Sequence, residues 1–397
     1  MKILHISTAD VRGAGLCAYR IHKTLLEIGH DSKLLVLEKG HKDSDVIKAF
    51  GVRSLVYRVF HQLLRWLRLY VFEYDKLIKL SNETNCFYSR PISPFDLSNS
   101  SLVKDADVIH LHWVDNYFDV PVFLKQVKKP IVWTLHDEGL FCGVAHYTNE
   151  ILPNHPLEMK YKTIKERMII NRGNTGIVFL SKYFFSNFSS HPAVRGCQLR
   201  VINNSVDCIK FHPYDKNTAR QRLGISADTI LFSFVAAKID DPRKGLMKLI
   251  RALEIINNPK MKILAVGNNQ SFEGHRLVQD VGSVNDTERM SLLLSSTDYY
   301  VMPSMKEAFA QSPIEAMACG VPAIVTPVSG TEELINEMCG VRCDGFEVSD
   351  IVIAINKAVQ TSYNKEQIIE YVKHGYSPEI ICKQYIDFYK SLVEASA

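Results

Sequence analysis

The chain has 397 residues, of which 46% are hydrophobic and 23% are charged, and it carries a formal net charge of +4 at pH 7. This length is enough for two domains, and the composition is ordinary for a soluble globular enzyme. The charges form no Lys/Arg block typical of nucleic-acid-binding arms, so we expect no nucleic-acid partner. Nine scattered cysteines favour a reduced, cytoplasmic protein over a disulfide scaffold.

Strand and helix signals alternate along the first half of the chain. A helix is expected at residues 16–28, and strands at residues 2–7, 32–37, 108–112, 131–135 and 176–180. The helix ends at Gly29, a residue common at helix C-termini. Alternation of this kind predicts an α/β fold, in which helices cover a parallel sheet.

The segment 9–15 is expected to form the loop between the first strand and the first helix. It contains the small residues Gly13, Ala14 and Gly15, which would let backbone amides approach an anion. Glycine is also common in strand–helix turns that bind nothing. The residues alone therefore leave a phosphate-binding loop and an ordinary turn open.

A basic amphipathic helix is predicted at residues 57–72. Its polar arc includes Arg58, Arg65 and Arg68, next to Trp66. Such a helix can lie in an anionic membrane interface, or it can pack into the core with a solvated face. The sequence leaves both environments open: the segment either binds an anionic membrane surface or packs against the rest of the protein.

His136 and Asp137 directly follow the strand expected at residues 131–135. Open parallel sheets keep their ligands at the carboxyl ends of the strands, so His136 is a candidate ligand-binding residue. A single histidine in such a place is also commonly a packed, hydrogen-bonded structural residue. The position alone does not decide between these interpretations.

The α/β pattern restarts after residues 201–207 and predicts a second domain. Its strands and helices are expected at residues 230–236, 246–256, 261–266, 287–295, 299–302 and 323–326, followed by a final helix at 378–394. Arg243 and Lys244 are expected where the helix at 246–256 opens. Two cations there favour a bound anion such as phosphate, although a bare pair also fits a solvated surface.

Glu307 and Glu315 lie in the segment Pro303–Pro327 with seven residues between them. Glu307 is expected in a turn after a strand, and Glu315 in the first turn of a helix that opens at Ser312. At such a corner they could hold sugar or ribose hydroxyls beside a phosphate. The alternatives are a solvated loop carboxylate for Glu307 and a capping box formed by Ser312 and Glu315.

This segment resembles the E-x7-E region of retaining glycosyltransferases of family 4, which have the GT-B fold. The pattern is matched by Pro303, Ser304, Glu307, Phe309, Glu315, Ala316, Met317, Ala318, Cys319, Gly320 and Pro322. A departure is Ala310, where the family has glycine in the loop that approaches the donor. The resemblance implies a donor site that includes Phe309, Ala310 and Gln311 beside both carboxylates, with Glu315 on the ribose hydroxyls.

Further segments resemble the same family. Residues 13–30 resemble its first loop and helix, and D-x-R-K-G at 241–245 implies that Arg243 and Lys244 contact the donor pyrophosphate. The segments V-I-H-L-H-W and T-L-H-D-x-x-x-F-x-G-x-x-H-Y resemble bacterial exopolysaccharide and colanic-acid-type members. They imply that His136 faces the donor sugar and the leaving phosphate, and that the acceptor side is lined by His110, His112, Trp113, Asp137, His146 and Tyr147.

From the resemblance we expect a GT-B protein with two Rossmann-like domains, residues 1–206 with a C-terminal helix at 379–397, and residues 207–378. The expected activity is retaining transfer of a hexosyl group from a GDP- or UDP-linked sugar to a saccharide or lipid-linked saccharide, in bacterial surface polysaccharide synthesis. The catalytic residues would be His136, Arg243, Lys244 and Glu307.

Members of this type generally need no metal, so we expect neither a cofactor nor a metal site. The protein would be cytoplasmic, or peripheral at the inner face of the membrane. Two alternatives stay open. One is a sugar-nucleotide epimerase or phosphorylase of the same fold, and the other is a non-catalytic module that binds a nucleotide sugar.

Overall fold

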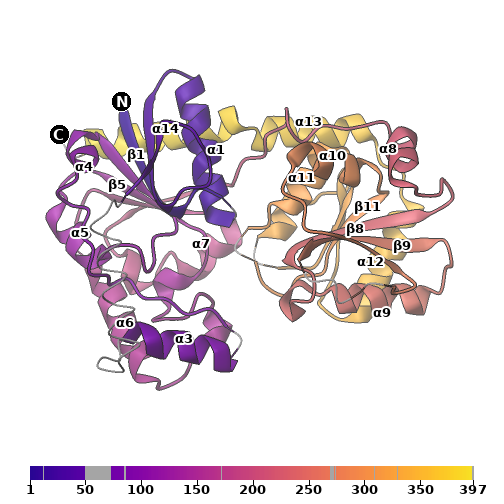
Figure 1. The fold of residues 1–397 in the computed structure, drawn as a ribbon, viewed down its shortest axis with the longest axis horizontal. Coiled ribbons are helices and arrows are strands. Elements are labelled where there is room, and N and C mark those ends of the chain that lie inside the picture. The colour runs from indigo at the N-terminus through magenta and orange to yellow at the C-terminus, as the bar shows by residue number, and fades with distance from the viewer. Residues whose placement is uncertain are drawn as a thin grey trace. The chain divides into compact units, whose positions relative to one another are not determined.

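The computed structural model describes residues 1–11, 13–49, 73–84, 86–170, 172–268, 272, 274–307, 309–328 and 330–395. The amphipathic helix predicted at 57–72 lies outside the described residues. The chain divides into two compact units (Figure 1). The N-terminal unit comprises Met1–Leu180, Phe185–Ile202 and Cys382–Ala397, and the C-terminal unit comprises Ser181–Phe184 and Asn203–Ile381.

The N-terminal unit is built on a parallel sheet with the strand order β3-β2-β1-β4-β5-β6-β7. The strands are β1 (Lys2–Ala9), β2 (Asp31–Glu38), β3 (Val46–Lys48), β4 (Val108–Leu111), β5 (Ile131–Leu135), β6 (Thr175–Phe179) and β7 (Gln198–Val201). Every residue of β4, β5 and β6 is buried, as expected for parallel strands covered on both faces. The strand order reverses between β1 and β4, and such a switch point is where open α/β sheets bind ligands.

Helices and short 3-10 turns connect these strands. They are α1 (Gly13–Glu27), α3 (Glu73–Thr84), α4 (Ser101–Asp105), α5 (Val120–Gln126), η1 (Gly139–Phe141), η2 (Thr148–Glu150), α6 (Pro156–Met168) and η3 (Pro192–Val194). Helices α7 (Lys182–Phe188) and α14 (Pro378–Glu394) contain residues of both units.

Helix α14 packs directly on strand β6. A Cβ atom on Gly176 would lie 2.4 Å from Phe388 Cζ and 2.8 Å from Leu392 Cδ1. The glycine therefore lets the helix approach the strand more closely than a larger residue would. Tyr385 and Tyr389 of the same helix are completely buried, so the end of the chain completes the core of the N-terminal unit.

The C-terminal unit contains a second parallel sheet with the order β10-β9-β8-β11-β12-β13. Its strands are β8 (Ile230–Lys238), β9 (Met261–Asn268), β10 (Val278–Gly282), β11 (Tyr299–Met302), β12 (Ala323–Val325) and β13 (Gly340–Arg342). Its helices and turns are α8 (Lys216–Leu223), η4 (Pro242–Lys244), α9 (Leu246–Ile256), α10 (Thr287–Ser295), α11 (Ser312–Ala318), η5 (Thr331–Leu334), α12 (Val348–Gln360) and α13 (Lys365–Tyr376).

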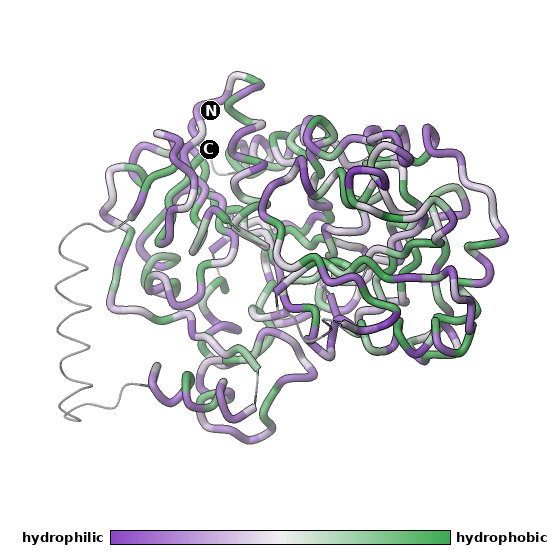
Figure 2. The backbone as a smooth tube through the Cα atoms, turned by 45° about the vertical axis from the view of Figure 1, so that its right-hand side comes forward, coloured by the Kyte–Doolittle hydropathy of each residue, from purple (hydrophilic) through white to green (hydrophobic). Residues whose placement is uncertain are grey.

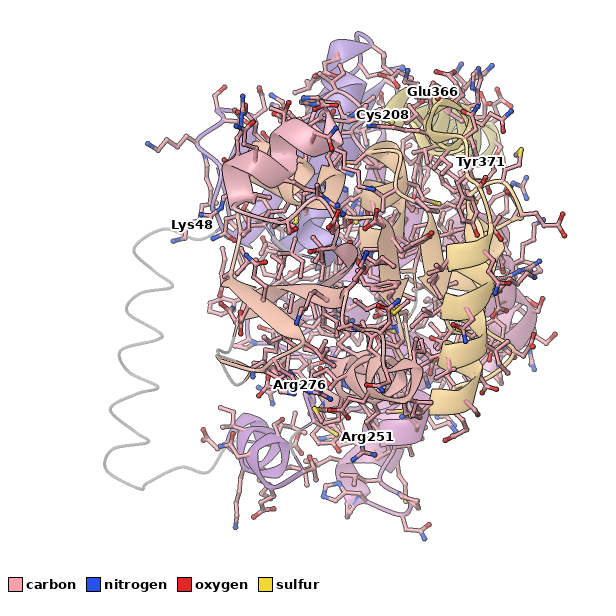
Figure 3. All side chains as sticks on the ribbon, turned by 90° about the vertical axis from the view of Figure 1, so that its right-hand side faces the viewer. Lys48, Cys208, Arg251, Arg276, Glu366 and Tyr371 are labelled. Atoms are coloured by element: carbon pink, nitrogen blue, oxygen red, sulfur yellow. The ribbon has the colours of Figure 1, made fainter. Side chains whose placement is uncertain are left out.

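Helix α9 shows how the apolar pattern positions an element in this unit. Leu246, Leu249, Ile250 and Leu253 are buried in the core shared with α12, and each fully buried side chain contributes about 1.5–3 kcal/mol. Arg251 lies on the opposite, exposed face, where Arg276 also projects from the surface (Figure 3). Leu246 thereby fixes the start of the helix directly after turn η4.

The predicted α/β fold is confirmed. The strands expected at 131–135 and 299–302 and the helices expected at 246–256, 287–295 and 378–394 have the predicted bounds. The short strands β3, β7, β10 and β13 were not predicted. Hydrophobic and hydrophilic segments alternate along the backbone (Figure 2), and among the described residues no helix is long and apolar enough to span a membrane.

Candidate active site

Arg243 and Lys244 lie in the short turn η4, directly before α9 begins at Leu246, where the sequence placed them. Asp241 caps the turn: its carboxylate accepts a hydrogen bond from Arg243 N at 2.9 Å and pairs with Arg243 Nη2 at 2.9 Å. Gly245 then adopts a left-handed φ of 78° before α9 begins. Burial alone would raise the pKa of Asp241, but the hydrogen bonds and charge of Arg243 bring that pKa below its usual value.

Lys244 forms an ion pair with Glu307, which also accepts a hydrogen bond from Ser304 Oγ at 3.1 Å. Only 13% of the Glu307 side chain and 29% of the Lys244 side chain are exposed. The alternative that Glu307 is a solvated loop carboxylate is therefore wrong. The structure instead joins a cation and a carboxylate that are far apart in the sequence.

Backbone contacts fix the two segments that carry this pair. Met305 N donates a hydrogen bond to Arg243 O at 2.8 Å. A Cβ atom on Gly245 would lie 2.2 Å from Pro303 O, so the turn and the loop after β11 touch at a glycine. Thr326 Oγ1 also donates to Ser304 O at 2.5 Å. The loop is held from both sides, which orients Glu307 toward Lys244.

Helix α11 begins without the capping box that was one alternative for Glu315. Its N-cap is Gln311, whose side chain makes no capping hydrogen bond, and Ser312 Oγ lies 2.6 Å from Tyr300 OH instead. Glu315 is half-buried in the first turn, where its backbone N donates to Gln311 O at 3.0 Å. The Ser312 hydroxyl therefore does not form its half of the capping box.

Phe309 and Ala310 are only 7% and 6% exposed. Their side chains belong to the interior of the C-terminal unit, so a bound donor would meet mainly their backbone. Gln311 is half-buried at the start of α11. Of these three predicted donor-loop residues, Gln311 has the most accessible side chain.

The segment Gly13–Gly15 forms the first turn of α1, and not part of a loop as predicted. Gly13 has a φ of 41°, and a Cβ atom on Gly15 would lie 2.3 Å from Ala9 O. The helix therefore starts against the end of β1, at the switch point of the sheet. Its first-turn amides have no partners within the helix, so an anion contact here stays a prediction.

Three imidazoles, His5, His112 and His136, form what we call the imidazole row. His5 lies in β1, His112 follows β4, and His136 follows β5. His112 Nε2 lies 3.1 Å from His5 Nδ1, and His112 Nδ1 lies 3.2 Å from His136 Nε2. Burial lowers the pKa of His136 to about 4, against the opposing charge of Asp137. His136 is therefore neutral at pH 7.

The expectation that His110 and His112 line an acceptor surface is not met, because they are only 0% and 1% exposed. The two ring nitrogens of His110 lie 2.7 Å from Tyr389 OH and 2.7 Å from Thr134 Oγ1. Its ring centroid is 4.0 Å from that of His112. Both histidines are core residues, and His110 ties β4 to α14.

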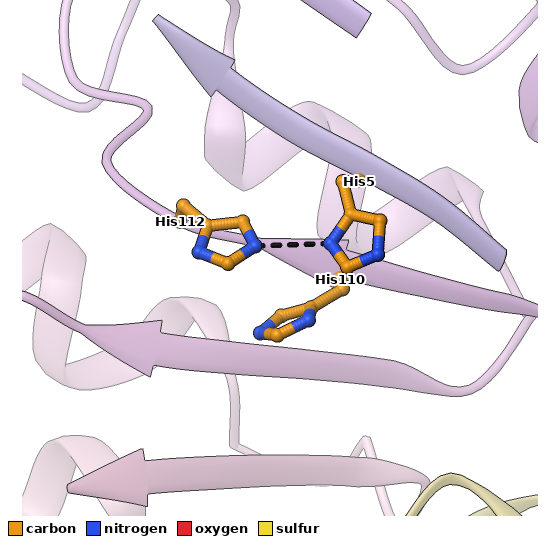
Figure 4. A group of neighbouring side chains, drawn as sticks. All are labelled: His5, His110 and His112. Carbon is orange, nitrogen blue, oxygen red and sulfur yellow. Dashed lines mark hydrogen bonds between the residues drawn. The ribbon is translucent and has the colours of Figure 1, made fainter. Parts of the chain in front are cut away.

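His5, His110 and His112 lie close together, with one ring nitrogen of each within 4.8 Å of the others (Figure 4). A metal ion would have to displace existing hydrogen bonds, since both nitrogens of His110 and both of His112 are engaged. The three rings also bring no negative charge to balance a buried cation. The arrangement fits hydrogen-bonded neutral imidazoles better than a metal centre.

Asp137 joins a second polar network. Its Oδ2 accepts from Trp113 Nε1 at 2.9 Å and lies 2.7 Å from His146 Nδ1. Burial alone would raise the pKa of Asp137 and lower that of His146, but their mutual attraction lowers the pKa of Asp137 and raises that of His146. His146 is buried, whereas Trp113 and Tyr147 are partly exposed. Of the predicted acceptor-side residues, the structure thus brings Trp113, Asp137 and His146 together.

Sequence reasoning missed three members of this network. Ser89 Oγ lies 2.8 Å from His146 Nε2 and donates to Asp115 Oδ2 at 2.5 Å. Lys165, only 2% exposed, lies 3.6 Å from Asp115 Oδ2 and donates to Gly139 O at 2.7 Å. Helix α6 is polar on most faces, so its sequence does not mark Lys165 as buried. A cavity of about 20 Å³ is lined by residues that include Trp113, Asp115, His136, Asp137 and Lys165.

The pairs Asp241–Arg243 and Lys244–Glu307, together with Glu315, lie within a recognised domain. Residues 215–375 match the family Glycosyl transferases group 1. A similar protein, also named as a glycosyltransferase, is the phosphatidylinositol N-acetylglucosaminyltransferase GPI3 subunit of Saccharomyces cerevisiae. It is 26% identical over 395 residues, which cover 96% of this chain and 80% of that protein. The group 1 domain and this relative support a glycosyltransferase.

Solved structures share the whole architecture. Sucrose-phosphate synthase from Thermosynechococcus elongatus has a TM-score of 0.68 at 17% identity and covers 99% of both chains. Anabaena HepE in complex with UDP has a TM-score of 0.65 at 18% identity and covers 98% of this chain and 100% of that one. At these identities the likeness shows the fold alone. The fold is GT-B, with two Rossmann-like parallel-sheet domains.

Proposed function

We propose that the protein is a retaining glycosyltransferase of family 4. It moves a hexosyl group from a GDP- or UDP-linked sugar to an acceptor hydroxyl in bacterial surface polysaccharide synthesis. The observation that carries the proposal is the ion pair between Lys244 and Glu307 in the group 1 domain. A cation suits the diphosphate of a nucleotide sugar and a carboxylate suits its sugar hydroxyls. Held next to each other, they fit two neighbouring parts of one donor molecule.

The other donor-side residues take roles around this pair. Arg243 is held in one orientation by Asp241 and adds positive charge for the diphosphate. Glu315 accepts hydrogen bonds from the ribose hydroxyls. His136 contacts the donor sugar. Negative charge develops on the diphosphate in the transition state as it leaves. The positive charges of Arg243 and Lys244 stabilise it there.

The reaction needs no protein nucleophile. The bond between the anomeric carbon and the diphosphate breaks, and the acceptor oxygen bonds to the same face of that carbon. The proton of the acceptor hydroxyl passes to an oxygen of the leaving phosphate. This route retains the anomeric configuration, and it is the route that the family resemblance implies.

The acceptor in this proposal is a saccharide or a lipid-linked saccharide at the cytoplasmic face of the inner membrane. Residues 57–72 would dock the protein there, with Arg58, Arg65 and Arg68 toward anionic lipid. Each cation near such a surface is worth about 1 kcal/mol and is screened by salt. This part of the proposal rests on the amphipathic pattern of the sequence and on the family resemblance.

A panel of nucleotide sugars tests the proposed activity. Incubated with the purified protein, one donor should be hydrolysed slowly to a nucleoside diphosphate and a free sugar whose anomeric configuration matches the donor. Conversion of the donor to another nucleotide sugar would establish the epimerase alternative instead. Tight binding of a nucleotide sugar with no hydrolysis, even with acceptor mixtures added, would leave only the non-catalytic module.

The cations should act as a diphosphate clamp. We expect Lys244→Ala and Arg243→Ala each to weaken binding of the free nucleoside diphosphate by about tenfold to a hundredfold, since each removes a charge-assisted contact worth roughly 1.5–3 kcal/mol. Binding of the nucleoside without phosphates should hardly change. Titration calorimetry with both ligands measures the difference.

Lys248→Ala is the matched control for this clamp. Lys248 lies in the first turn of α9 and donates to Phe346 O at 2.6 Å. Its replacement by Ala therefore removes a lysine charge but leaves the ion pair of Glu307 in place. It should leave diphosphate binding nearly unchanged. An equal loss for nucleoside and diphosphate in the Lys244 variant would contradict the clamp.

We also propose that transfer proceeds without a metal ion, because Lys244 and Arg243 supply the positive charge for the diphosphate. Incubation with EDTA, followed by removal of the chelate on a desalting column, should leave the rate of donor hydrolysis unchanged. A large loss of rate that added Mg²⁺ or Mn²⁺ restores would refute this part of the proposal.

A further inference from the structure

The imidazole row ends at an atom without a partner. His5 Nδ1 bonds to His112 Nε2 (Figure 4), but His5 Nε2 is buried and has no hydrogen-bond partner among the described residues. Burial lowers the pKa of His5, His112 and His136, and neighbouring histidines lower those of His5 and His112 further. Each ring of the row is therefore neutral and carries a single hydrogen on one of its two nitrogens.

Neutral rings allow two arrangements of hydrogens along the row. In the first, His5 donates from Nδ1 to His112, and His112 donates from Nδ1 to His136 Nε2. In the second, every hydrogen is on Nε2, so His136 donates to His112 and His112 donates to His5. Both arrangements form the same two hydrogen bonds. The two ends of the row therefore decide which arrangement is more stable.

The end at His5 favours the first arrangement. In the second, His5 Nε2–H would be a buried donor with no acceptor, and buried N–H groups are left unpaired more rarely than acceptors are. In the first, the same atom is a bare nitrogen. His136, at the other end, is the ring of the row with an exposed part, so its Nδ1–H can be satisfied by solvent or ligand.

Two polar groups beside the row, Asp137 and His110, already have hydrogen-bond partners, and a third ring, His22, approaches His5 with a centroid distance of 6.2 Å. The carboxylate of Asp137 is already engaged by the N–H groups of Trp113 and Gly139 and by His146 Nδ1. Both nitrogens of His110 are engaged by hydroxyl groups. The bond from His112 is thus the one that sets the hydrogen on His136.

We propose that His5 and His112 are positioning residues that hold His136 in its Nδ1–H tautomer. The inference rests on the proposed role of His136 at the donor sugar and gives that role a direction. With Nε2 occupied by His112, His136 presents a hydrogen-bond donor, which recognises an oxygen of the sugar or of its phosphate. It is not the base that deprotonates the acceptor, so the acceptor proton goes to the leaving phosphate.

Nuclear magnetic resonance of the ¹⁵N-labelled wild-type protein tests this directly. Two-bond correlations between ring nitrogens and ring carbon-bound hydrogens identify which nitrogen carries the hydrogen, and single His→Gln variants assign the signals. The expected result at pH 7.5 is a protonated Nδ1 and a bare Nε2 in His136, His112 and His5. A protonated Nε2 in His136 would overturn the inference, and this measurement needs no functional assay.

Two variants test whether His112 sets the tautomer. In His112→Leu the His136 signals should shift to a mixture of tautomers, and donor turnover should fall about fivefold, the equivalent of one ordinary hydrogen bond. In His112→Asn the amide N–H can still donate, so the Nδ1–H signature should return. His22→Leu is the control for loss of a buried imidazole, because His22 bonds to Ser32 Oγ at 2.8 Å and meets the row only through a ring contact with His5, 6.2 Å between centroids. An unchanged His136 tautomer in His112→Leu would also overturn the inference.

The experiments can refute the proposed tautomer of His136 and the proposed activity independently of each other. If the nucleotide-sugar panel gives no product while His136 shows Nδ1–H, the proposed function is refuted and the positioning role of the row stands. If a donor is turned over while His136 shows Nε2–H, the function stands and the positioning role is refuted.

Discussion

Replacing Glu307 by Gln should reduce turnover by about a hundredfold or more, a loss of roughly 3 kcal/mol of transition-state stabilisation, while the nucleoside diphosphate still binds. In the proposed function this carboxylate holds the sugar, so we expect turnover to depend on its charge. Neutralising it also removes the anion that competes with the diphosphate for Lys244. Diphosphate affinity should therefore stay the same or increase. Steady-state kinetics and calorimetry on the same preparation measure both effects.

The structure also changes the stability expected for this variant. Glu307 is largely buried and accepts from Lys244 and Ser304, so it has structural partners that a solvated carboxylate would lack. Gln can still accept both hydrogen bonds, and the loss should be about 1 kcal/mol. Glu315→Gln is the companion variant and should mainly raise the donor KM. Wild-type kinetics in both variants would refute the donor-side assignment.

Acidification should unfold the N-terminal unit well above the pH at which its carboxylates titrate. The pKa values of His5, His110 and His112 lie well below the ordinary value of 6.5, and that of His22 lies at about 4, with burial as the main cause. The unfolded chain therefore binds more protons than the native protein below pH 6.5. Each such ring removes about 1.4 kcal/mol of stability per pH unit until its native pKa is reached.

His146 does not oppose this effect. Its pKa is raised, so its contribution is fully present below pH 6.5 and is lost as pH rises through its native pKa. The lowered pKa of Asp137 matters only near and below pH 4, where its stabilising charge is lost. The histidines should therefore dominate the slope of stability between pH 6.5 and about 5, above the range in which Asp and Glu ordinarily titrate.

Urea denaturation followed by tryptophan fluorescence measures that slope in the N-terminal unit, because the three tryptophans are Trp66, Trp113 and Trp133. His22→Asn should reduce the slope by about one proton per molecule. Replacing His374, whose side chain is 81% exposed, should leave it unchanged. A free energy of unfolding that is flat from pH 6.5 to pH 5 would contradict the assignment of these rings as buried and neutral.

Local patterns in the sequence were sufficient for the main elements of the fold. Mostly apolar strands such as β5 and amphipathic helices such as α9 are marked by their own residue patterns and end signals. The strands β3 and β13 have three residues each, as does the predicted β12, but β12 is apolar throughout whereas β3 and β13 each end in a cationic residue. Their pairing is decided by neighbouring strands and not by a local apolar run.

The site residues were predictable where a motif keeps its members close in sequence. They were less predictable where burial in the folded protein decides which groups a side chain contacts. Glu315 lies in the helix turn that the sequence indicated. That Lys244 reaches Glu307 depends on a loop fixed by Met305 and Thr326, which no spacing reveals. His110 follows a ligand-binding pattern in sequence, yet the packing of Tyr389 makes it a core residue. Lys165 carries no signal at all, because an isolated lysine on a polar helix looks solvated.

The packing of Phe388 and Leu392 against Gly176 also sets an order in which the protein can be completed during synthesis. Domains fold as units while the chain emerges from the ribosome, N-terminal ones usually first. Here β6 stays uncovered until residues 385–392 have been added, and the hydroxyl of Tyr389 that bonds His110 arrives with them. We therefore expect the core of the N-terminal unit to close only after α14 has been made, and the uncovered face of β6 to be open to chaperones until then.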